Sequence, residues 1–259
     1  MPFIRPFEPK DTEACKHICR ATLPPTLASD PEAVRMAPYI WCLQFLHLSP
    51  QTCFVLVDDD DDSNTSSPKD GNDGQDKQDE KGEKVVGYII GTPDVFAFTS
   101  SYGRYITEVL QSPQGLLDVR PPPQLDALEP WLIPDYMQFK KVINTVSLAQ
   151  HAYKPEWLVL SGPEGGAGEE QRKEMVENWR GMLHIDLLEG YQGKGWGRKM
   201  IERFCEAVKS SGGDYGRGVN MGIAGENQKV VKFYEKVGFR VFGGVPGEVE
   251  GGVWMVRDL

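Results

Sequence analysis

The feature that most constrains this sequence is a strand-like run that leads through a glycine-rich turn into an amphipathic helix. Residues 184–197 read HIDLLEGYQGKGWG, with four glycines in the last eight positions, and RKMIERFCEAV follows. A turn of this kind between a strand and a helix directs several backbone N–H groups and the positive end of the helix dipole to one point. The sequence therefore predicts an anion-binding loop.

Three phosphate-binding patterns can be compared with this loop. Gly190 and Gly195 have the spacing of the Walker pattern GxxxxGK[ST]. This pattern nevertheless fails, because Gly195 is followed by Trp196 and not by lysine and a hydroxyl residue. The dinucleotide pattern GxGxxG fails because the glycines are spaced as GxGxG. The pattern that fits is Q/R-x-x-G-x-G/A, read over Gln192, Gly193, Lys194, Gly195, Trp196 and Gly197.

The composition indicates one globular domain over residues 1–259. The chain is 40% hydrophobic, and its densest apolar stretch, residues 36–48, is too short to span a membrane. The N-terminal residues resemble no targeting signal, so we expect a cytoplasmic or nuclear protein with no membrane contact. The net charge of −10 argues against a nucleic-acid surface.

Much of this charge lies in one segment, residues 58–84, which has 11 acidic residues, 4 lysines and no apolar side chain. Such a segment cannot bury enough surface to offset its conformational entropy, so we expect a disordered acidic loop inserted between two strands. An alternative is that its carboxylates attract a cationic substrate or a basic partner.

The five cysteines are odd in number and mostly fall in apolar patterns, which favours reduced thiols. Cys15, His17 and Cys19 are spaced so that the two thiols share a helix face but the imidazole does not. No second ligand pair follows, so the sequence predicts no metal site.

Strand and helix patterns alternate along the chain. Strands are expected at 52–57 and 85–91 as a hairpin, and a β-α-β-α-β-β arrangement is expected from residue 182 onward. A helix that starts at Asp30 should be interrupted at Pro38, and 137–150 should be helical. The weakly patterned segment 92–180 is interpreted as a substrate-side insertion within the domain.

The glycine loop and two further stretches resemble the GNAT superfamily of N-acetyltransferases. ENQKVVKFYEKVGFRVFG is similar to the family's second motif, with Asn227, Phe233, Tyr234, Gly238 and Phe239 matching and Val230 in place of alanine. The opening FIRPFEPKDTEACKHIC is similar to the first strand and helix of the family. The resemblance covers about residues 1–57, 85–92 and 182–258. It implies an α+β, three-layer fold with a mixed sheet of about seven strands between helices.

Within this superfamily, HID at 184–186, IRPF and the helix carrying Asn227 and Tyr234 look most like the acetyltransferase-like C-terminal domain of O-GlcNAcase and its free-standing microbial relatives. The resemblance implies that the loop wraps the diphosphate of acetyl-CoA. The implied cofactor-binding residues are Asp186, Leu187, Leu188, Gln192, Gly193, Lys194, Gly195, Trp196, Gly197, Arg198, Asn227, Phe233 and Tyr234. Lys199 is a further cation near the phosphates. The alternative for Lys194, Arg198 and Lys199 is that they are simply solvated at a helix start.

The resemblance also implies roles for side chains in acetyl transfer. Tyr234 matches the general acid that protonates the leaving thiolate, and its alternative is a core aromatic. Asp186 is the expected base, with His184 on the same strand face as its partner or relay. A buried hydrogen-bonded pair is the alternative for these two. Asn227 matches a cofactor contact and could also cap its helix.

The sequence therefore predicts an N-acetyltransferase that passes acetyl from acetyl-CoA to a primary amine by direct attack in a ternary complex. No cysteine occupies an acyl-enzyme position. The alternative is a module that binds acetyl-CoA without turnover, and a third possibility is an acidic interaction scaffold. We expect a monomer or homodimer. The acceptor pocket should draw on the first two helices and on 92–180, where aromatic residues either line it or form core: Trp131, Tyr136, Tyr153 and Trp157.

Overall fold

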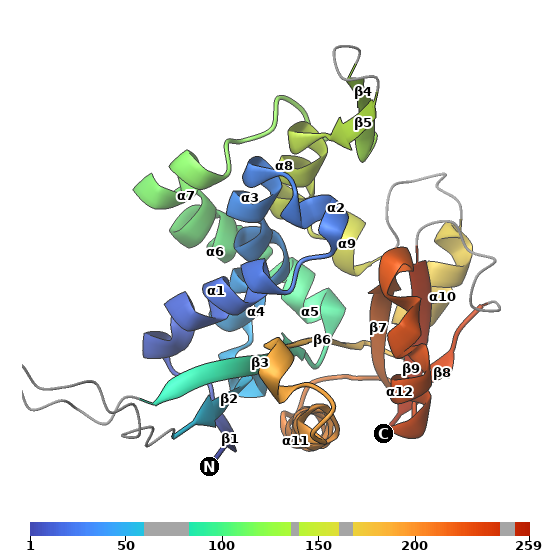
Figure 1. The fold of residues 1–259 in the computed structure, drawn as a ribbon. Helices are drawn as coiled ribbons and strands as arrows, with labels where there is room; N and C mark the ends of the chain where they lie inside the picture. Colours follow the sequence, from blue (N-terminus) through green and yellow to red (C-terminus); the bar gives the residue numbers. More distant parts are fainter. Residues whose placement is uncertain (60–82, 136–139, 161–167, 244–251) are drawn as a thin grey trace, which may run out of the picture.

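The fold is built on a mixed sheet with helices on both faces (Figure 1). The computed structural model describes residues 1–59, 83–135, 140–160, 168–243 and 252–259. Within them, seven strands pair in the order β1-β2-β3-β6-β7-β9-β8, as the sequence predicts. These strands are β1 (Phe3–Pro6), β2 (Phe54–Asp58), β3 (Lys84–Thr92), β6 (Gly181–Leu187), β7 (Gly218–Ala224), β8 (Arg240–Val241) and β9 (Gly252–Asp258).

Neighbouring strands of this sheet are antiparallel except for the central pair β6 and β7, which is parallel. The predicted hairpin of β2 and β3 is present, and so is the predicted C-terminal β-α-β-α-β-β arrangement. A separate two-stranded hairpin, β4 (Leu132–Asp135) and β5 (Lys140–Ile143), projects from the helical layer (Figure 1).

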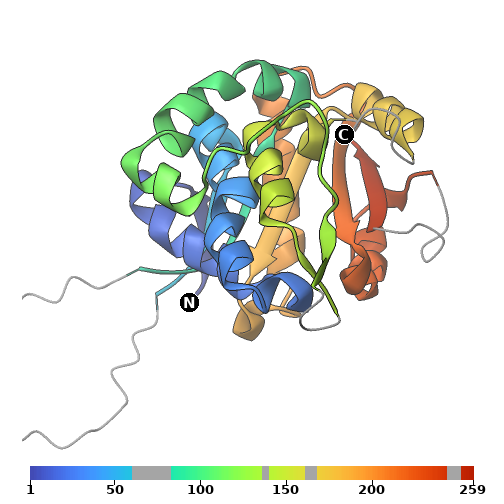
Figure 2. The same ribbon diagram turned by 90° about the horizontal axis from the view of Figure 1, so that it is seen from above.

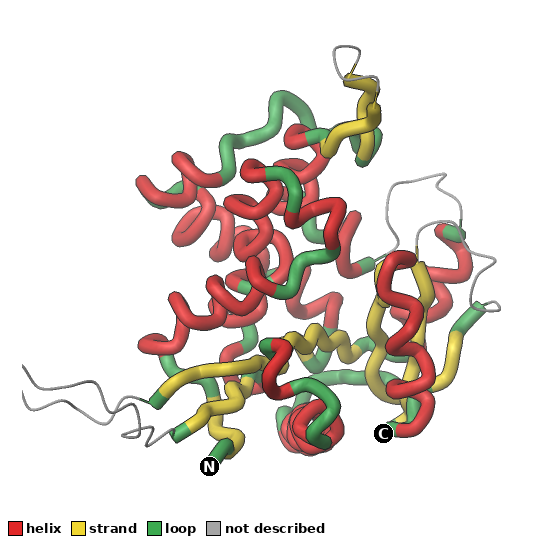
Figure 3. Tube along the Cα trace, in the orientation of Figure 1, coloured by secondary structure: helices red, strands yellow, loops and turns green. Residues whose placement is uncertain are grey.

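Two hydrophobic cores lie on opposite faces of the sheet because side chains alternate along each strand. In β2 and β3, Val55 and Tyr88 belong to one core, and Leu56 and Ile89 to the other. The second core is covered by α11 (Trp196–Ser210) and α12 (Val231–Lys236). The first lies under the thicker helical layer, in red above the strands in Figure 3. That layer contains α1 (Thr12–Ala21), α2 (Pro25–Ala28), α3 (Pro31–Trp41), α4 (Leu43–Leu48), α5 (Val95–Ser100), α6 (Tyr102–Tyr105), α7 (Pro113–Asp118), α8 (Thr145–Tyr153), α9 (Glu156–Val159) and α10 (Glu169–Asn178).

The two predicted insertions differ in what the structure describes. Most of the acidic segment 58–84 lies outside the described residues, and only its ends are placed, in β2 and β3. The described part of 92–180 forms α5 to α10 and the hairpin. Seen from above, helices α5 to α9 lie beside the N-terminal ones over the same face of the sheet (Figure 2).

Two local predictions were wrong. Helix α3 continues through Pro38 to Trp41, and the helical conformation is interrupted one residue later, at Cys42. Proline removes the N–H that would bond the Val34 carbonyl, and Arg20 Nε, at 3.3 Å, takes that carbonyl instead. The predicted helix 137–150 is the strand β5 up to Ile143 where it is described, and only then the helix α8.

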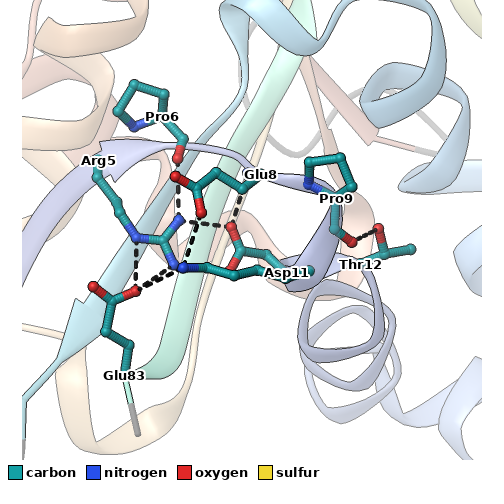
Figure 4. Close-up of polar contacts among 8 residues, drawn as sticks. Arg5, Pro6, Glu8, Pro9, Asp11, Thr12 and Glu83 are labelled. Atoms are coloured by element: carbon teal, nitrogen blue, oxygen red, sulfur yellow. Dashed lines mark hydrogen bonds and ion pairs between the residues drawn. The ribbon is translucent and has the colours of Figure 1, made fainter. Parts of the chain in front are cut away.

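An ion-pair cluster joins the first strand, the first helix and the start of β3 (Figure 4). The Arg5 guanidinium donates to both carboxylate oxygens of Asp11, at 2.7 and 2.8 Å, and to Glu83. The Glu8 amide donates to Asp11 as well. Asp11 is the N-cap residue of α1, but its carboxylate caps nothing in that helix and serves the cluster instead.

We expect Arg5→Met to lower the free energy of unfolding by about 2 kcal/mol at pH 7, because a charged hydrogen-bond partner of a buried carboxylate is lost. Burial alone would raise the pKa of Asp11, but Arg5 and the Glu8 amide lower it overall. The stabilisation is therefore present above the ordinary carboxyl pKa and disappears as the pH falls through the lowered one. Urea unfolding of both proteins between pH 7 and pH 3 measures this, with Arg203→Met, which removes an exposed surface ion pair with Glu206, as a control that should change stability little.

Candidate active site

The glycine loop after β6 is held in place by two side-chain contacts. The Tyr191 hydroxyl, in the 3₁₀ turn η4 (Glu189–Tyr191), donates to the Asp58 carboxylate at 2.5 Å. The Gln192 side-chain amide donates to the Leu187 carbonyl at 2.8 Å. The loop is therefore tied to the ends of β2 and β6 in the structure.

Two glycines give this loop its backbone path. Gly193 and Gly195 have φ angles of +70° and +84°, in the left-handed region that glycine adopts without steric cost. A Cβ built on either would meet nothing within 4 Å. The requirement for glycine here therefore comes from the backbone conformation and not from lack of space.

Helix α11 starts directly after these turns. Gly195 is its N-cap residue, and no side chain caps its first turn. The first N–H groups of a helix have no intrahelical partner, and with the helix dipole they favour an anion. This arrangement fits the diphosphate-binding loop that the sequence predicts.

Gly197 and Phe233, both predicted at the cofactor, contact each other. A Cβ at Gly197 would lie 3.0 Å from Phe233 Cζ, so the glycine lets α12 pack on the first turn of α11. The Phe233 side chain remains partly exposed beside this contact.

The cations around the loop are already engaged with protein groups. Arg198 donates to the Lys236 carbonyl at 3.0 Å, and the Lys199 ammonium lies 4.4 Å from the centre of the Trp196 ring. The Lys194 ammonium lies 5.7 Å from the centre of the Tyr191 ring. All three side chains are exposed at the loop, so they surround the predicted phosphate position without occupying it.

Strands β6 and β7 pair only near their N-terminal ends and separate well before the glycine loop. They pair at only two positions, Gly181 with Val219 and Met182 with Asn220. Beyond Met182, β6 continues to Leu187 against β3 alone. The resulting wedge between two parallel strands, called the splay below, leaves one edge of β6 open to an extended ligand.

Asp186, Leu187 and Leu188 are expected to contact the cofactor, but only one of their three backbone amides faces this splay. The Leu188 amide donates to the Val86 carbonyl of β3 at 3.0 Å, so this amide is not free to contact the cofactor. Because donors alternate along an antiparallel strand, the Asp186 amide faces β3 too. The Leu187 amide is the one of the three that points into the splay.

A polar cluster lies beside the splay on the face covered by the thick helical layer. His184 Nε2 lies 3.0 Å from Asp186 Oδ2, which confirms that these side chains share one face. The Tyr88 hydroxyl donates to the same Asp186 oxygen from β3, where Tyr88 is the register partner of Asp186. Tyr88 is fully buried, whereas the Asp186 and His184 side chains are 18% and 38% exposed.

The two charged forms of this cluster stabilise each other. Burial alone would lower the pKa of His184, but the negative charge and hydrogen bond of Asp186 raise it. Burial alone would raise the pKa of Asp186, but His184, Tyr88 and Thr22 lower it. Asp186 is therefore held as an anion, and His184 has a higher proton affinity than a free imidazole.

Tyr234 reaches the same place from the other face of the sheet. It is 8% exposed on α12, in the core under α11, and its hydroxyl makes no hydrogen bond with another described residue. Burial and then the charge of Asp186 raise its pKa, so the phenol stays protonated near neutral pH. A phenol of this kind can donate a proton but does not ionise on its own.

Asn227 is exposed and lies apart from the helix that it was predicted to cap. It belongs to the 3₁₀ segment η5 (Gly225–Val230) with a non-helical conformation, and α12 starts only at Val231. The prediction of a helix from 227 was therefore wrong, whereas a contact from Asn227 to the cofactor stays a prediction.

Sequence reasoning missed Tyr88. The signal was present, because in VVGYIIG the tyrosine is the only polar group that a buried strand would carry toward a neighbouring strand. Only the register that places it opposite Asp186 reveals its partner.

The aromatic residues named for the acceptor pocket divide between core and surface. Tyr153 and Trp157 are 8% and 6% exposed, and Trp131 is 36% exposed. Tyr136 lies outside the described residues.

The cysteines behave as core residues. All five are free and buried, and Cys15 and Cys19 pack in the first core. Burial raises the pKa of the Cys19 thiol, next to Tyr88, to about 12, so it is not a thiolate nucleophile at neutral pH. Within the described residues, no group of three or more His, Cys, Asp or Glu side chains could hold a metal ion.

The loop, the splay and Tyr234 lie in the part of the chain that matches a known family. Residues 164–239 match the model of the acetyltransferase (GNAT) family. No curated protein matches the sequence.

Solved structures resemble this fold over nearly the whole chain. The crystal structure of SsHAT superposes with a TM-score of 0.66 at 22% identity and covers 99% of this chain and 98% of its own. PH1933 from Pyrococcus horikoshii OT3 has a TM-score of 0.47 at 13% identity, with 100% and 99% covered. A GCN5-related N-acetyltransferase from Kribbella flavida has a TM-score of 0.44 at 15% identity, with 100% and 98% covered. In the described part of the chain, no helix has the length and apolar character needed to span a membrane.

Proposed function

We propose that this GNAT protein transfers acetyl from acetyl-CoA to a primary amine by direct attack in a ternary complex. The observation that carries the proposal is the convergence of three features at the splay. These are an uncapped helix N-terminus, an open edge of β6, and the polar groups of Tyr234, Asp186 and His184 from the two faces of the sheet. We also propose that its nearest functional kin are the O-GlcNAcase acetyltransferase-like domain and its microbial relatives, on the HID motif at 184–186.

Each group has a role in this reaction. The amides of the loop and of the α11 start would hold the diphosphate, with Lys194, Arg198 and Lys199 adding positive charge. The Leu187 amide would donate to the acetyl oxygen as negative charge develops there, a contribution worth about 3 kcal/mol in comparable sites. Tyr234 would protonate the departing sulfur.

The acceptor would approach from the side of the thick helical layer. His184 and Asp186 face that layer, and the described residues of 92–180 form much of it. We therefore keep 92–180 as the acceptor-side insertion. An anionic Asp186 beside a partly exposed imidazole suits a cationic amine, which must lose a proton before it can attack.

A second function, cofactor binding without turnover, is favoured by one observation. Asp186 Oδ2 already accepts two hydrogen bonds, and the pKa of its carboxyl is lowered, which makes the aspartate a weak base. Thiol release from acetyl-CoA with a panel of primary amines separates the two functions. Amine-dependent release supports the enzyme, and none across polyamines, arylalkylamines, amino sugars and basic peptides supports the binding module.

Binding itself should appear as a thermal shift. Acetyl-CoA at 100 times its Kd should raise the melting temperature by roughly 5–10 °C, because a ligand that binds only the folded state adds its binding free energy to stability. Acetylpantetheine, which lacks the diphosphate, should produce a much smaller shift at the same concentration. Equal shifts for the two compounds would mean that the loop does not bind the diphosphate.

A further inference from the structure

The hydrogen bonds around Asp186 fix which nitrogen of His184 carries a proton. Asp186 Oδ2 accepts the Tyr88 hydroxyl on one side and faces His184 Nε2 at 3.0 Å on the other. An ionised carboxylate can only accept, so Nε2 must be the protonated nitrogen. In the neutral ring, Nδ1 then carries the lone pair.

Tyr88 can only donate a hydrogen bond to Asp186, and this fixes the direction of the hydrogen bonds around the carboxylate. It lies opposite Asp186 in the register of β3 and β6 and is fully buried, so its position is set by the sheet. Burial and the charge of Asp186 raise the pKa of the phenol, which therefore remains a donor. Its proton occupies one lone pair of Oδ2 and leaves the other for His184.

His184 Nδ1 is the accessible member of this chain of groups. The imidazole is about twice as exposed as the carboxylate, at 38% against 18% of the side chain. No described residue is hydrogen-bonded to Nδ1. The titratable groups that surround the pair are Tyr88 from β3, Cys19 from α1, Cys42 after α3 and Tyr234 from α12. Each of these is neutral at pH 7, so Asp186 is the charge that governs His184.

We propose that His184 Nδ1 takes the proton from the attacking amine, and that Asp186 and Tyr88 are positioning residues that fix its tautomer. This rests on the proposed acetyl transfer and revises the expectation that Asp186 is the base. The ammonium nitrogen gives one proton to Nδ1, which passes it to solvent, and the freed lone pair forms the C–N bond to the thioester carbon. As the C–S bond breaks, the same nitrogen gives its second proton to the neutral Nδ1. The thiolate takes the Tyr234 proton, and solvent returns both groups to their starting states.

Proton affinity supports this assignment of roles. A lowered carboxyl pKa places Asp186 further from an alkylamine, whose pKa is about 10, than His184 with its raised pKa. Proton transfer to the imidazole is therefore less unfavourable than transfer to the carboxylate.

Nitrogen-15 NMR of histidine-labelled protein tests the tautomer directly, with His184→Gln to assign the signal. Wild type should show a neutral ring protonated at Nε2. Asp186→Asn should lower the pKa of His184 by about one unit or more, because the paired charge is removed. Tyr88→Phe should give a mixture of tautomers. A wild-type ring protonated at Nδ1 would overturn the proposal, whatever the activity.

The acid limb of kcat/KM for amine acetylation supplies the second readout. In wild type, kcat/KM should rise with pH as His184 loses its proton, with a midpoint at the pKa measured for this residue by NMR. In Asp186→Asn, this rise should move to lower pH, with kcat reduced and KM little changed. His47→Gln, which removes a histidine paired with Glu108 elsewhere, should leave the profile unchanged. An active enzyme whose limb ignores Asp186→Asn overturns the role of His184 alone. A wild type that binds acetyl-CoA and acetylates no amine overturns the proposed function as well.

Discussion

Tyr234→Phe should lower kcat for acetyl transfer about 100-fold while leaving the Kd for acetyl-CoA nearly unchanged. General acid catalysis by a positioned side chain contributes 10²-fold or more, and the substitution removes only a hydroxyl that has no described protein partner. Steady-state thiol release and calorimetric binding, on the same preparations, measure the two quantities. Because the loss comes in proton delivery to sulfur, a substrate with a better leaving thiol should recover part of the rate.

The pH dependence strengthens this test. The raised pKa of Tyr234 keeps the phenol protonated, so its donor form persists on the alkaline side and produces no fall in kcat below pH 10. Tyr215→Phe serves as the matched control, since that tyrosine lies in the turn before β7, at the end opposite the splay. Full activity in Tyr234→Phe would remove the general acid from the mechanism and leave Tyr234 as a core aromatic.

Local patterns in the sequence predict much of this fold. Continuous apolar runs in β2 and β3 identify a hairpin although 25 residues, 59–83, separate the strands, because each strand buries both faces between two cores. The glycine loop can be predicted from the sequence as well. Its backbone turns require residues that tolerate positive φ, and the glycines at these positions identify the turns.

The wrong predictions fall where a distant contact outweighs a local preference. Pro38 should break a helix, but Arg20 satisfies the carbonyl that the proline leaves unpaired. Arg20 lies 14 residues from Val34, so this compensation is not visible in a window of neighbouring residues.

The candidate site divides in the same way. The proposed anion-binding half is one continuous segment, so its glycine turns can be predicted from neighbouring residues. The proposed proton-handling half is assembled from β3, β6 and α12, and depends on a strand register that no motif records. Tyr88 was missed, and the pairing of the Leu188 amide could not be foreseen, because both depend on how β3 pairs with β6.

Gly195→Val should raise the Kd for acetyl-CoA at least 10-fold and leave the fold intact. At φ of +84°, a β-branched residue costs about 1–3 kcal/mol in the left-handed region, so the turn must relax away from its present path. That relaxation moves the amides at the start of α11, and every 1.4 kcal/mol lost from their contacts is a factor of ten in affinity.

Gly190→Val isolates this conformational effect. Gly190 lies in the same loop, its φ is not in the left-handed range, and a Cβ there would meet nothing within 4 Å. It should therefore bind acetyl-CoA like wild type, with both variants compared by isothermal calorimetry after thermal unfolding has shown native stability. If Gly195→Val binds as tightly as Gly190→Val, the diphosphate is not held by the backbone of this turn. The cations Lys194, Arg198 and Lys199 would then have to carry the affinity, and its salt dependence would be correspondingly steep.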